Sequence, residues 1–443
     1  MFRSLMSFLV VGGFLGTGSL WAQTREEKVR NDKAKVEAAG VWIYNNFPKA
    51  VEEAKSSRKP IMAVLRCLPC EECVKLDDEI IDADTRIQPL LEKFVRVRLV
   101  STNGLDLSLF QFDTDQSFAV FFLNADGTIY GRFGTRSDSK NWVGDVSVDG
   151  LAKAMRGALV LHNDFPENRQ SLQAKRGPLP QFARPELLPS LKAKYTSTLN
   201  YEGKVVPSCI HCHQIGDATR DLYLNSKNPL PEEILFPYPH PKTIGLTLDP
   251  KEMATVLAVE KGSDAAKAGF QSGDRIATLQ GQPLLSIADV QWVLDRIPPA
   301  GGEVVAEVNR GQAIETLKLN LPTDWRRRGD LAWRASTWGL RRKALGGIFS
   351  KASPEAVRKD LQIPEGSMAL VVEHVGQFAP HDVAHRAGVK KGDIIIGFDG
   401  RTDLLRETDL IAWSLQNKKG GSKVVLDILR DGKKQMIPMR IPD

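Results

Sequence analysis

The seven residues AGFQSGD at positions 268–274 recur as AGVKKGD at positions 387–393, an offset of 119 residues. The match continues outward, because Arg310-Gly311 corresponds to Arg430-Asp431-Gly432. Each glycine of the repeated unit indicates a tight turn that needs a positive φ, and each Asp starts a strand. Two copies at this spacing predict two similar domains of about 80–100 residues, because the period is too long for a solenoid repeat.

The repeated unit, Ala-Gly-x-x-x-Gly-Asp with a following apolar strand and Gly turn, resembles PDZ domains. The resemblance implies that a peptide terminus adds as a strand to an exposed sheet edge, and that backbone N–H groups of a Gly-containing loop capture its carboxylate. It implies domains at residues 242–323 and 337–442, with protein or peptide C-termini as partners. The implied peptide-binding residues are Ile244, Gly245 and Leu246 in the first copy, and Gly346, Gly347 and Ile348 in the second. The alternative is an ordinary β-rich domain with two Gly-Asp turns.

PDZ domains of this type often accompany trypsin-like periplasmic proteases. The chain has no Gly-x-Ser-Gly-Gly segment that would supply a nucleophile. The protease chemistry is therefore missing, and we do not expect a protease.

Upstream of the repeats, residues 40–163 alternate between helix-type and strand-type patterns. Short apolar strands are expected at 61–65, 95–100 and 118–123, and a turn at 124–127 starts a hairpin. A helix is expected at 151–161 to close the domain. A β-α-β half followed by a β-β-α half is the order of the thioredoxin fold. The whole chain is therefore expected to be a multidomain α/β plus β-rich protein.

Three cysteines, Cys67, Cys70 and Cys73, form two overlapping CxxC pairs behind the expected strand at 61–65. A cysteine at a helix N-terminus has a stabilised thiolate, and a second one a turn later can resolve a mixed disulfide. The stretch from Lys59-Pro60 to Asp77 resembles thioredoxin-like proteins. That resemblance makes Cys70 the attacking residue and Cys73 the resolving one.

The sequence departs from the thioredoxin-like pattern at two places. Glu71 and Glu72 oppose a thiolate at Cys70 by like charge. Phe118 stands where the family usually has a cis-proline facing the disulfide. Three interpretations remain open for the cluster: a working dithiol or peroxide site, a structural disulfide on a degenerate thioredoxin fold, and a metal site of three thiols.

A third feature, Cys209-Ile210-His211-Cys212-His213, has the spacing of covalent haem c attachment. Cys209 and Cys212 would bind the haem vinyl groups and His213 the iron, and His240 is the best-placed distal ligand. The alternative is a second dithiol, or a zinc site using His211 or His213. Prolines punctuate residues 164–241 on both sides of the motif, which indicates a linker or a small module.

The N-terminus predicts export. Arg3 precedes an apolar stretch from Leu5 to Leu15, and small residues continue to Ala22, so residues 1–22 are expected to be a signal peptide. Since Leu20 is large for a cleavage site, an uncleaved membrane anchor is the alternative. The chain is expected in the periplasm or another extracytoplasmic compartment, where disulfides can form.

Composition adds little to the choice of function. The formal net charge of +6 over 443 residues does not require nucleic acid as a partner. The run Arg326-Arg327-Arg328 is the densest basic patch, and we expect it to be a solvated linker face.

The combination of motifs resembles thioredoxin-like plus PDZ (seleno)proteins of planctomycete-type bacteria. The resemblance implies a redox role, and a redox partner protein, without naming a substrate. Three functions remain open: a thiol redox protein with client-binding PDZ domains, which could exchange electrons with a haem; a non-enzymatic PDZ adaptor on a degenerate thioredoxin fold; and a c-type electron carrier with a structural disulfide.

Overall fold

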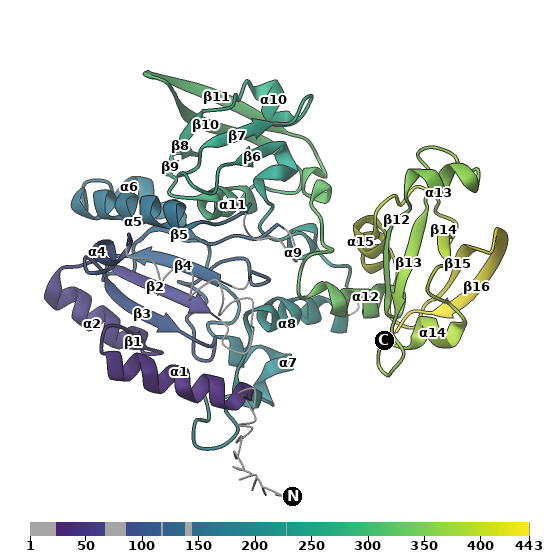
Figure 1. The fold of residues 1–443 in the computed structure, drawn as a ribbon, viewed down its shortest axis with the longest axis horizontal. Coiled ribbons are helices and arrows are strands. Elements are labelled where there is room, and N and C mark those ends of the chain that lie inside the picture. Colours follow the sequence, from purple (N-terminus) through teal and green to yellow (C-terminus); the bar gives the residue numbers. More distant parts are fainter. Residues whose placement is uncertain (1–23, 67–85, 117, 138–143, 227, 443) are drawn as a thin grey trace, which may run out of the picture.

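A computed structural model describes the chain outside four internal gaps and the two ends. The described residues are 24–66, 86–116, 118–137, 144–226 and 228–442. The expected signal peptide and the cluster Cys67, Cys70 and Cys73 lie outside them. An α/β domain comes first, and two β-rich domains follow (Figure 1). The fold class expected from the sequence is confirmed.

The first domain contains a five-stranded sheet in the order β1-β3-β2-β4-β5. Its strands are β1 (Ile43–Tyr44), β2 (Ile61–Arg66), β3 (Val95–Leu99), β4 (Phe118–Leu123) and β5 (Ile129–Phe133). The first three are parallel, whereas β4 runs antiparallel to both of its neighbours, β2 and β5. Every residue of β2 and β4 is buried, because helices and loops cover both faces of these central strands.

The helices of this domain are α1 (Arg25–Ala39), α2 (Phe47–Ser57), α4 (Gln88–Leu91) and α5 (Val148–Asn163). Alternation along β2 divides its side chains between two cores. Met62 and Val64 pack with residues of α4 and α5, whereas Ile61 and Ala63 pack with residues of α2. Thr24 caps α1 through a reciprocal capping box with Glu27.

The proline-rich region from 164 to 241 is an ordered module of short helices. They are α6 (Arg169–Leu172), α7 (Pro189–Lys192), α8 (Cys212–Asn225) and α9 (Glu232–Leu235). Leu188, Leu191, Ile210 and Ile215 make a small core of their own. Of these helices, α8 and α9 lie between the first domain and the second β-rich domain (Figure 1), whereas α7 packs on α8 and α6 contacts β9 (Gln282–Pro283) of the first β-rich domain.

The first β-rich domain begins after the short helical turn at Pro241–Ile244. Its elements are β6 (Leu246–Leu248), β7 (Val256–Val259), α10 (Asp264–Ala268), β8 (Arg275–Leu279), β9 (Gln282–Pro283), α11 (Ile287–Asp295), β10 (Gly302–Arg310) and β11 (Ala313–Leu321). β6 and β7 pair with each other, and the remaining strands form a sheet in the order β11-β10-β8-β9.

The second β-rich domain has a similar order of elements, with one helix added in front and another after its first strand, and without a counterpart of β9. It consists of α12 (Thr337–Leu345), β12 (Ile348–Ala352), α13 (Glu355–Asp360), β13 (Leu370–Val375), α14 (Val383–Ala387), β14 (Ile394–Phe398), α15 (Glu407–Asn417), β15 (Lys423–Arg430) and β16 (Lys433–Arg440). Its five strands form one sheet in the order β12-β13-β14-β15-β16, so β12 is an edge strand.

The repeated heptapeptide has the same structure in both domains. Its first glycine ends a short helix with φ of 90° at Gly269 and 100° at Gly388. Its Asp is buried and binds an arginine, and the two arginines are the ones that the sequence repeat aligns with each other. Nε of Arg310 lies 2.7 Å from Asp274 Oδ1, and Nε of Arg430 lies 2.7 Å from Asp393 Oδ1. The positive φ expected from the sequence is confirmed.

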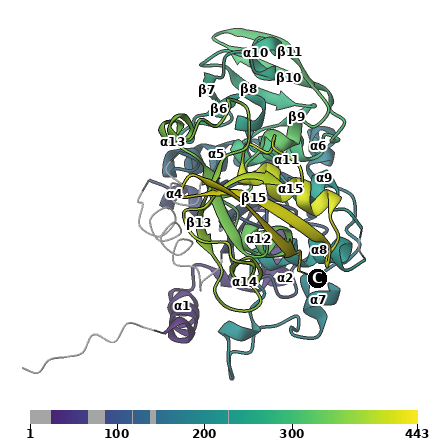
Figure 2. The ribbon, with the colours of Figure 1, turned by 90° about the vertical axis from the view of Figure 1, so that its right-hand side faces the viewer.

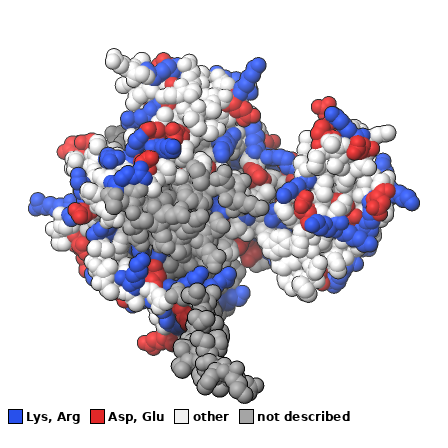
Figure 3. All heavy atoms as spheres, viewed as in Figure 1, with Lys and Arg blue, Asp and Glu red and all other residues white. Residues whose placement is uncertain are grey.

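The two β-rich domains are placed differently. The first packs on β5 through α11, whereas the second stands apart as a lobe at the right of Figure 1. Figure 2 looks onto that lobe, with the first β-rich domain above it. Figure 3 shows the lobe joined by a narrow neck, with basic and acidic side chains interspersed on the visible face. Among the described residues, no helix has the length and apolarity of a membrane span.

One expectation about the linker is wrong. Arg326, expected on a solvated face, is 1% exposed, and its Nη2 donates to the carbonyl oxygens of Asp295 and Ile297 at 2.6 and 2.8 Å. Its charge is held by the C-terminal end of α11, where unpaired carbonyls attract a cation. Within the run, Arg327 and Arg328 keep substantial exposure.

Candidate functional site

The CxxCH segment is attached to the carboxyl edge of the parallel strands. Asn103, four residues beyond β3, accepts from the Ile210 N–H at 2.8 Å and donates to the Ser208 carbonyl at 3.0 Å. Thr102 donates to the Ile210 carbonyl from both its N–H and its hydroxyl. β2 is the neighbour of β3 and ends at Arg66, one residue before Cys67 in the sequence. In α/β folds this edge commonly carries the functional site.

Both cysteines of the segment are buried. Cys209 is 5% and Cys212 is 9% exposed, and Cys212, the first residue of α8, packs into the core that α2 and β2 share. Burial raises the pKa of Cys209 to about 12, and a contact with Ser101 offsets only part of this. At neutral pH Cys209 is therefore a protonated thiol, which is a poor nucleophile.

The histidines of the segment stack on each other. The rings of His211 and His213 lie 5.9 Å apart at an interplanar angle of 12°. His213 Nδ1 lies 3.2 Å from Asp217 Oδ2, one turn further along α8. Burial, with the nearby charges of His213 and Arg25, lowers the pKa of His211.

The structure does not bring His240 to the CxxCH segment. Its ring packs 3.7 Å from Asp145, and its Nδ1 accepts from the Lys242 N–H at 3.3 Å. Burial lowers the pKa of His240 to about 3, so the imidazole is neutral. This placement argues against His240 as a distal haem ligand for His213.

Haem c fits these residues only in part. Asp217 lies beside Nδ1 of His213, which is the arrangement in which a carboxylate orients many metal-binding histidines. The two thiols, however, are buried against packed side chains, so bonding them to a porphyrin would require the segment to leave the first domain. The segment as it is packed does not fit the group, and haem stays a prediction. Among the described residues, no three His, Cys, Asp or Glu side chains gather as a metal site.

Phe118, at the position where the family usually has a cis-proline, lies within the described residues. It begins β4 opposite Arg66, the last residue of β2, and is 3% exposed. Its ring packs in the core together with residues of α5. Cys67, Cys70 and Cys73, the predicted catalytic residues, lie outside the described residues and remain predictions.

The six predicted peptide-binding residues lie at corresponding places in the two β-rich domains. All are buried, with Ile244 and Leu246 at 1% and Ile348 at 0% exposed. Gly245 and Gly346 adopt positive φ of 85° and 65°, which suits the predicted loops. Both loops are therefore formed, and other parts of the chain cover them.

The first β-rich domain is covered by the first domain. Asp289 of α11 accepts from the Arg132 N–H at 3.1 Å, and Lys175 Nζ lies 3.1 Å from the same carboxylate. Asp289 is 1% and Lys175 0% exposed. Gly131 permits this close approach, because an added Cβ would lie 2.5 Å from Leu285 Cδ1. The segment after β5 continues across α11, since Thr135 hydrogen-bonds to Gln291.

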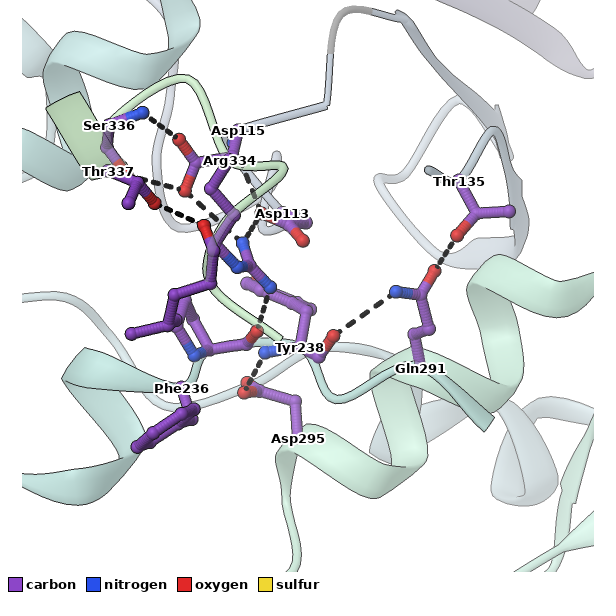
Figure 4. A network of polar contacts seen from close by, with 12 residues as sticks. Asp113, Asp115, Thr135, Phe236, Tyr238, Gln291, Asp295, Arg334, Ser336 and Thr337 are labelled. Carbon is purple, nitrogen blue, oxygen red and sulfur yellow. Dashed lines mark hydrogen bonds and ion pairs between the residues drawn. The ribbon is translucent and has the colours of Figure 1, made fainter. Parts of the chain in front are cut away.

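A buried polar network that the sequence analysis missed joins the second β-rich domain to the first domain (Figure 4). Arg334 Nη1 lies 2.7 Å from Asp113 Oδ1 and 3.2 Å from Asp115 Oδ2. Ser336 donates to Asp115 from its N–H and its hydroxyl, each at 2.9 Å. All four are at most 7% exposed. Burial raises the pKa of Asp113 despite Arg334, while Arg220 and Arg334 overcome burial and lower the pKa of Asp115.

The fold and these sites define a class of proteins in which a thioredoxin-like domain is joined to two PDZ domains. A family model described as thioredoxin-like matches residues 42–125, and a PDZ domain model matches residues 242–321 and 350–440. The chain therefore contains a thioredoxin-like domain and two PDZ domains.

Similarity to individual proteins is partial. A curated relative, the periplasmic pH-dependent serine endoprotease DegQ of Escherichia coli (strain K12), is 27% identical over 150 residues, which are 34% of this chain and 29% of DegQ. Among solved structures, the HtrA-type protease AlgW with a decapeptide is 17% identical, covers 32% of this chain and 48% of its own, and has a TM-score of 0.21. The chain thus spans less than a third of the length of the curated relative that it matches.

Proposed function

We propose that this chain is an extracytoplasmic thiol-disulfide, or peroxide, redox protein whose PDZ domains bind protein or peptide clients. The carrying observation is the attachment of the CxxCH segment, through Asn103, to the sheet edge at which β2 ends. The CxxCH segment is thereby held at the edge of the thioredoxin-like sheet where β2 ends, and the other cysteine motif follows β2 in the sequence. PDZ domains generally bind peptide or protein C-termini, which supports the client-binding part.

The proposed chemistry is disulfide exchange. The Cys70 thiolate attacks one sulfur of a client disulfide, which forms a mixed disulfide and releases the other client sulfur as a thiolate. Cys73 then attacks Cys70 and releases the second client thiolate, so that two electrons pass to the client and the cysteine pair becomes oxidised. A redox partner protein would restore the dithiol. Cys209, with its raised pKa, stays outside this first step.

The test measures dithiol couples in protein exported with its own signal. Thiol trapping in glutathione buffers, with site-resolved mass spectrometry, reads each cysteine pair separately. We expect a reversible Cys70–Cys73 couple and insulin reduction that Cys70→Ser and Cys73→Ser abolish. Cys209→Ser is the matched control and should retain activity. Activity that survives Cys70→Ser would contradict the proposed role of Cys70.

Alkylation of Cys209 gives a second readout that depends on its pKa. Only the thiolate reacts, so an ordinary thiol with a pKa of about 8.5 becomes about tenfold more reactive for each unit by which the pH rises toward that pKa. With its raised pKa of about 12, Cys209 has roughly a thousandth of the thiolate of an ordinary thiol at pH 8. Iodoacetamide should label it slowly in native protein and quickly in urea. Rapid native labelling at pH 8 would show that the segment is not packed against the first domain.

A non-enzymatic PDZ adaptor is the second candidate, and Phe118 is the observation that favours it. A buried phenylalanine at the start of β4 replaces the residue that guides substrates in thioredoxin-like proteins. Insulin or peroxide reduction that depends on Cys70 would rule the adaptor out. Haem binding remains a separate proposal, tested by a pyridine haemochrome spectrum of protein matured in a host competent for cytochrome c, with Cys212→Ser as control.

A further inference from the structure

Helix α12 occupies the place at which a ligand would join the second PDZ domain. α12 runs directly into the carboxylate-binding loop at 345–348 and packs on both α15 and β12. β12 is the open edge of its sheet, and a peptide ligand of a PDZ domain adds beside that edge. Leu340 and Ala344 of α12 are 3% and 0% exposed and belong to the domain core.

The loop amides that would capture a carboxylate are bonded to α12. The Gly346 N–H donates to the Arg342 carbonyl at 3.0 Å, and the Gly347 N–H donates to the Arg341 carbonyl at 3.2 Å. These bonds satisfy carbonyl groups at the C-terminus of the helix, which have no partner within it. A bound carboxylate would need the same two N–H groups, so it competes with the last turn of α12.

The edge of strand β12 is also occupied, because the salt bridge between Arg341 and Glu407 lies against it. The Ser350 N–H of β12 donates to Glu407 Oε1 at 2.7 Å, so this N–H is directed away from the neighbouring strand toward α15. Arg341 of α12 binds the same carboxylate, with Nε at 3.0 Å from Oε1 and Nη2 at 2.6 Å from Oε2. The Arg341 guanidinium also lies 4.4 Å from the ring centroid of Phe349 on β12. Arg341 thus bridges β12 and α15, the two elements between which a PDZ ligand would bind and which we call the groove.

The opposite end of α12 is tied to the thioredoxin-like domain. Ser336, the residue before the helix, binds Asp115, and Arg334 binds both Asp113 and Asp115 (Figure 4). These two carboxylates lie in the loop that leads into β4. One helix therefore connects the binding edge of the second PDZ domain to the thioredoxin-like sheet.

We propose that α12 is the resident occupant of the second PDZ groove, and that a peptide C-terminus binds only by displacing it. Displacement removes Arg341 from Glu407, so the fitting ligand ends in a free carboxylate and brings its own Lys or Arg to this buried acid. Since α12 is anchored at Asp115, its departure loosens the loop before β4. Peptide binding and the state of the thioredoxin-like domain are therefore coupled, and the coupling acts in both directions.

This inference rests on the proposed peptide binding, and the experiment separates the two. The probe is a fluorescein-labelled decapeptide that ends in Arg-Ala-Leu with a free carboxylate, compared with a Glu-Ala-Leu version and with an amidated version. Anisotropy is measured on full-length protein, on Arg341→Gln, and on Arg342→Gln as a control that removes the same charge from the same helix without touching Glu407. Hydrogen exchange of residues 333–345 is followed with and without peptide.

We expect the Arg peptide to bind in preference to the other two. Arg341→Gln should tighten binding about tenfold and Arg342→Gln by less than about twofold, because the apparent affinity rises with the fraction of protein whose groove is open. Peptide should speed exchange in α12 of the wild-type protein, a readout that needs no variant. Glu407→Gln should remove the preference for Arg over Glu in the peptide.

Two results would overturn the inference, and they are distinguishable. Equal affinity in wild type, Arg341→Gln and Arg342→Gln, with unchanged exchange in α12, leaves peptide binding intact and refutes occupancy by the helix. No binding of any of the three peptides by wild type, Arg341→Gln or Glu407→Gln refutes peptide binding by this domain, and occupancy of its groove by α12 with it.

Discussion

The two PDZ domains contain the same repeated motif, but different parts of the chain cover their helices. In the first, residues of the thioredoxin-like domain cover α11, and every residue from Ile287 to Leu294 is buried. In the second, α15 is covered chiefly by α12, which belongs to the same lobe. The first PDZ domain is thus packed against the thioredoxin-like domain through α11, whereas the second PDZ domain contacts it mainly through the residues before α12. The same fold can serve as a structural support and as a binding module.

The corresponding acids Asp289 and Asp409 show this difference at single residues. Asp289 is buried between two domains and pairs with the fully buried Lys175. Asp409 is 28% exposed and forms a capping box with Arg406 at the start of α15. Equivalent positions in the repeat therefore have different roles because of what surrounds them.

The largest effect should come from Asp289→Ala. Removing this acid leaves Lys175 as an uncompensated buried charge, which costs about 3–5 kcal/mol. Asp409→Ala removes a partly exposed cap and should cost about 1 kcal/mol. Calorimetric unfolding of both variants measures the contrast. Equal losses of stability would show that Asp289 does not hold the first PDZ domain to the body.

A smaller effect is expected at the neck, the buried network of Asp113, Asp115, Arg334 and Ser336 that joins the second PDZ domain to the thioredoxin-like domain. Arg334→Met leaves Asp113 and Asp115 buried with fewer partners and should cost about 3 kcal/mol of docking energy. Arg327→Met, which removes a pair with Glu232 at a 40% exposed arginine, should cost less than about 1 kcal/mol. Small-angle scattering and limited proteolysis should show a mobile second lobe in the first variant alone. An unchanged scattering profile would contradict the role of this network.

A third pair of variants tests where the two domains should agree. Arg310→Met and Arg430→Met each remove the arginine of the repeated ion pair, whose geometry is the same in both copies. Each should cost about 1–3 kcal/mol, because the buried acid keeps only its backbone hydrogen bond. The two losses should agree within about 1 kcal/mol, because Arg310 additionally loses its pair with the 40% exposed Glu315, where Arg430 has only Gln435. A large difference between the two stability losses would mean that neighbouring residues change the strength of even this repeated ion pair.

The smallest effect is expected at the exposed rim of the interface between the thioredoxin-like domain and the first PDZ domain. Lys153 and Glu252 pair across it with 38% and 42% of their side chains exposed. Lys153→Ala should cost at most about 1 kcal/mol, and less at high salt, because water and ions screen exposed pairs. Stability measured at low and at high salt, about 50 and 500 mM, checks this. A stability loss for Lys153→Ala that exceeds the loss for Arg334→Met would contradict the expectation that the exposed pair matters less than the buried network.

Much of the fold could be predicted from local sequence. The strands expected at 61–65 and 118–123 are β2 and β4, extended by at most one residue, because continuous apolar runs between turn signals identify buried strands. The buried Asp–Arg pairs were not predicted, although the repeat did align Arg310 with Arg430 and one acid with the other. These features depend on neighbours in sequence or on the internal repeat.

The candidate sites were less predictable because they depend on contacts between distant segments. Asn103, Asp113 and Asp115 are ordinary loop residues in the sequence, and their partners at 210 and 334–336 follow more than a hundred residues later. Likewise, an arginine-rich run gives no sign that Arg326 is buried at the end of a helix. His240 was placed by spacing alone, and its burial beside Asp145 follows from tertiary packing.

The network at the neck also sets an order of events in time. Asp113 and Arg334 are 221 residues apart. At a synthesis rate of about 5–20 residues per second, the acid emerges roughly 10–45 s before its arginine. During that interval Asp115 can already pair with Arg220, but neither acid in the loop before β4 has Arg334 as a partner. The polar contacts of this loop are therefore completed only by Arg334 and Ser336, so a chain truncated before residue 334 would leave Asp113 without its arginine.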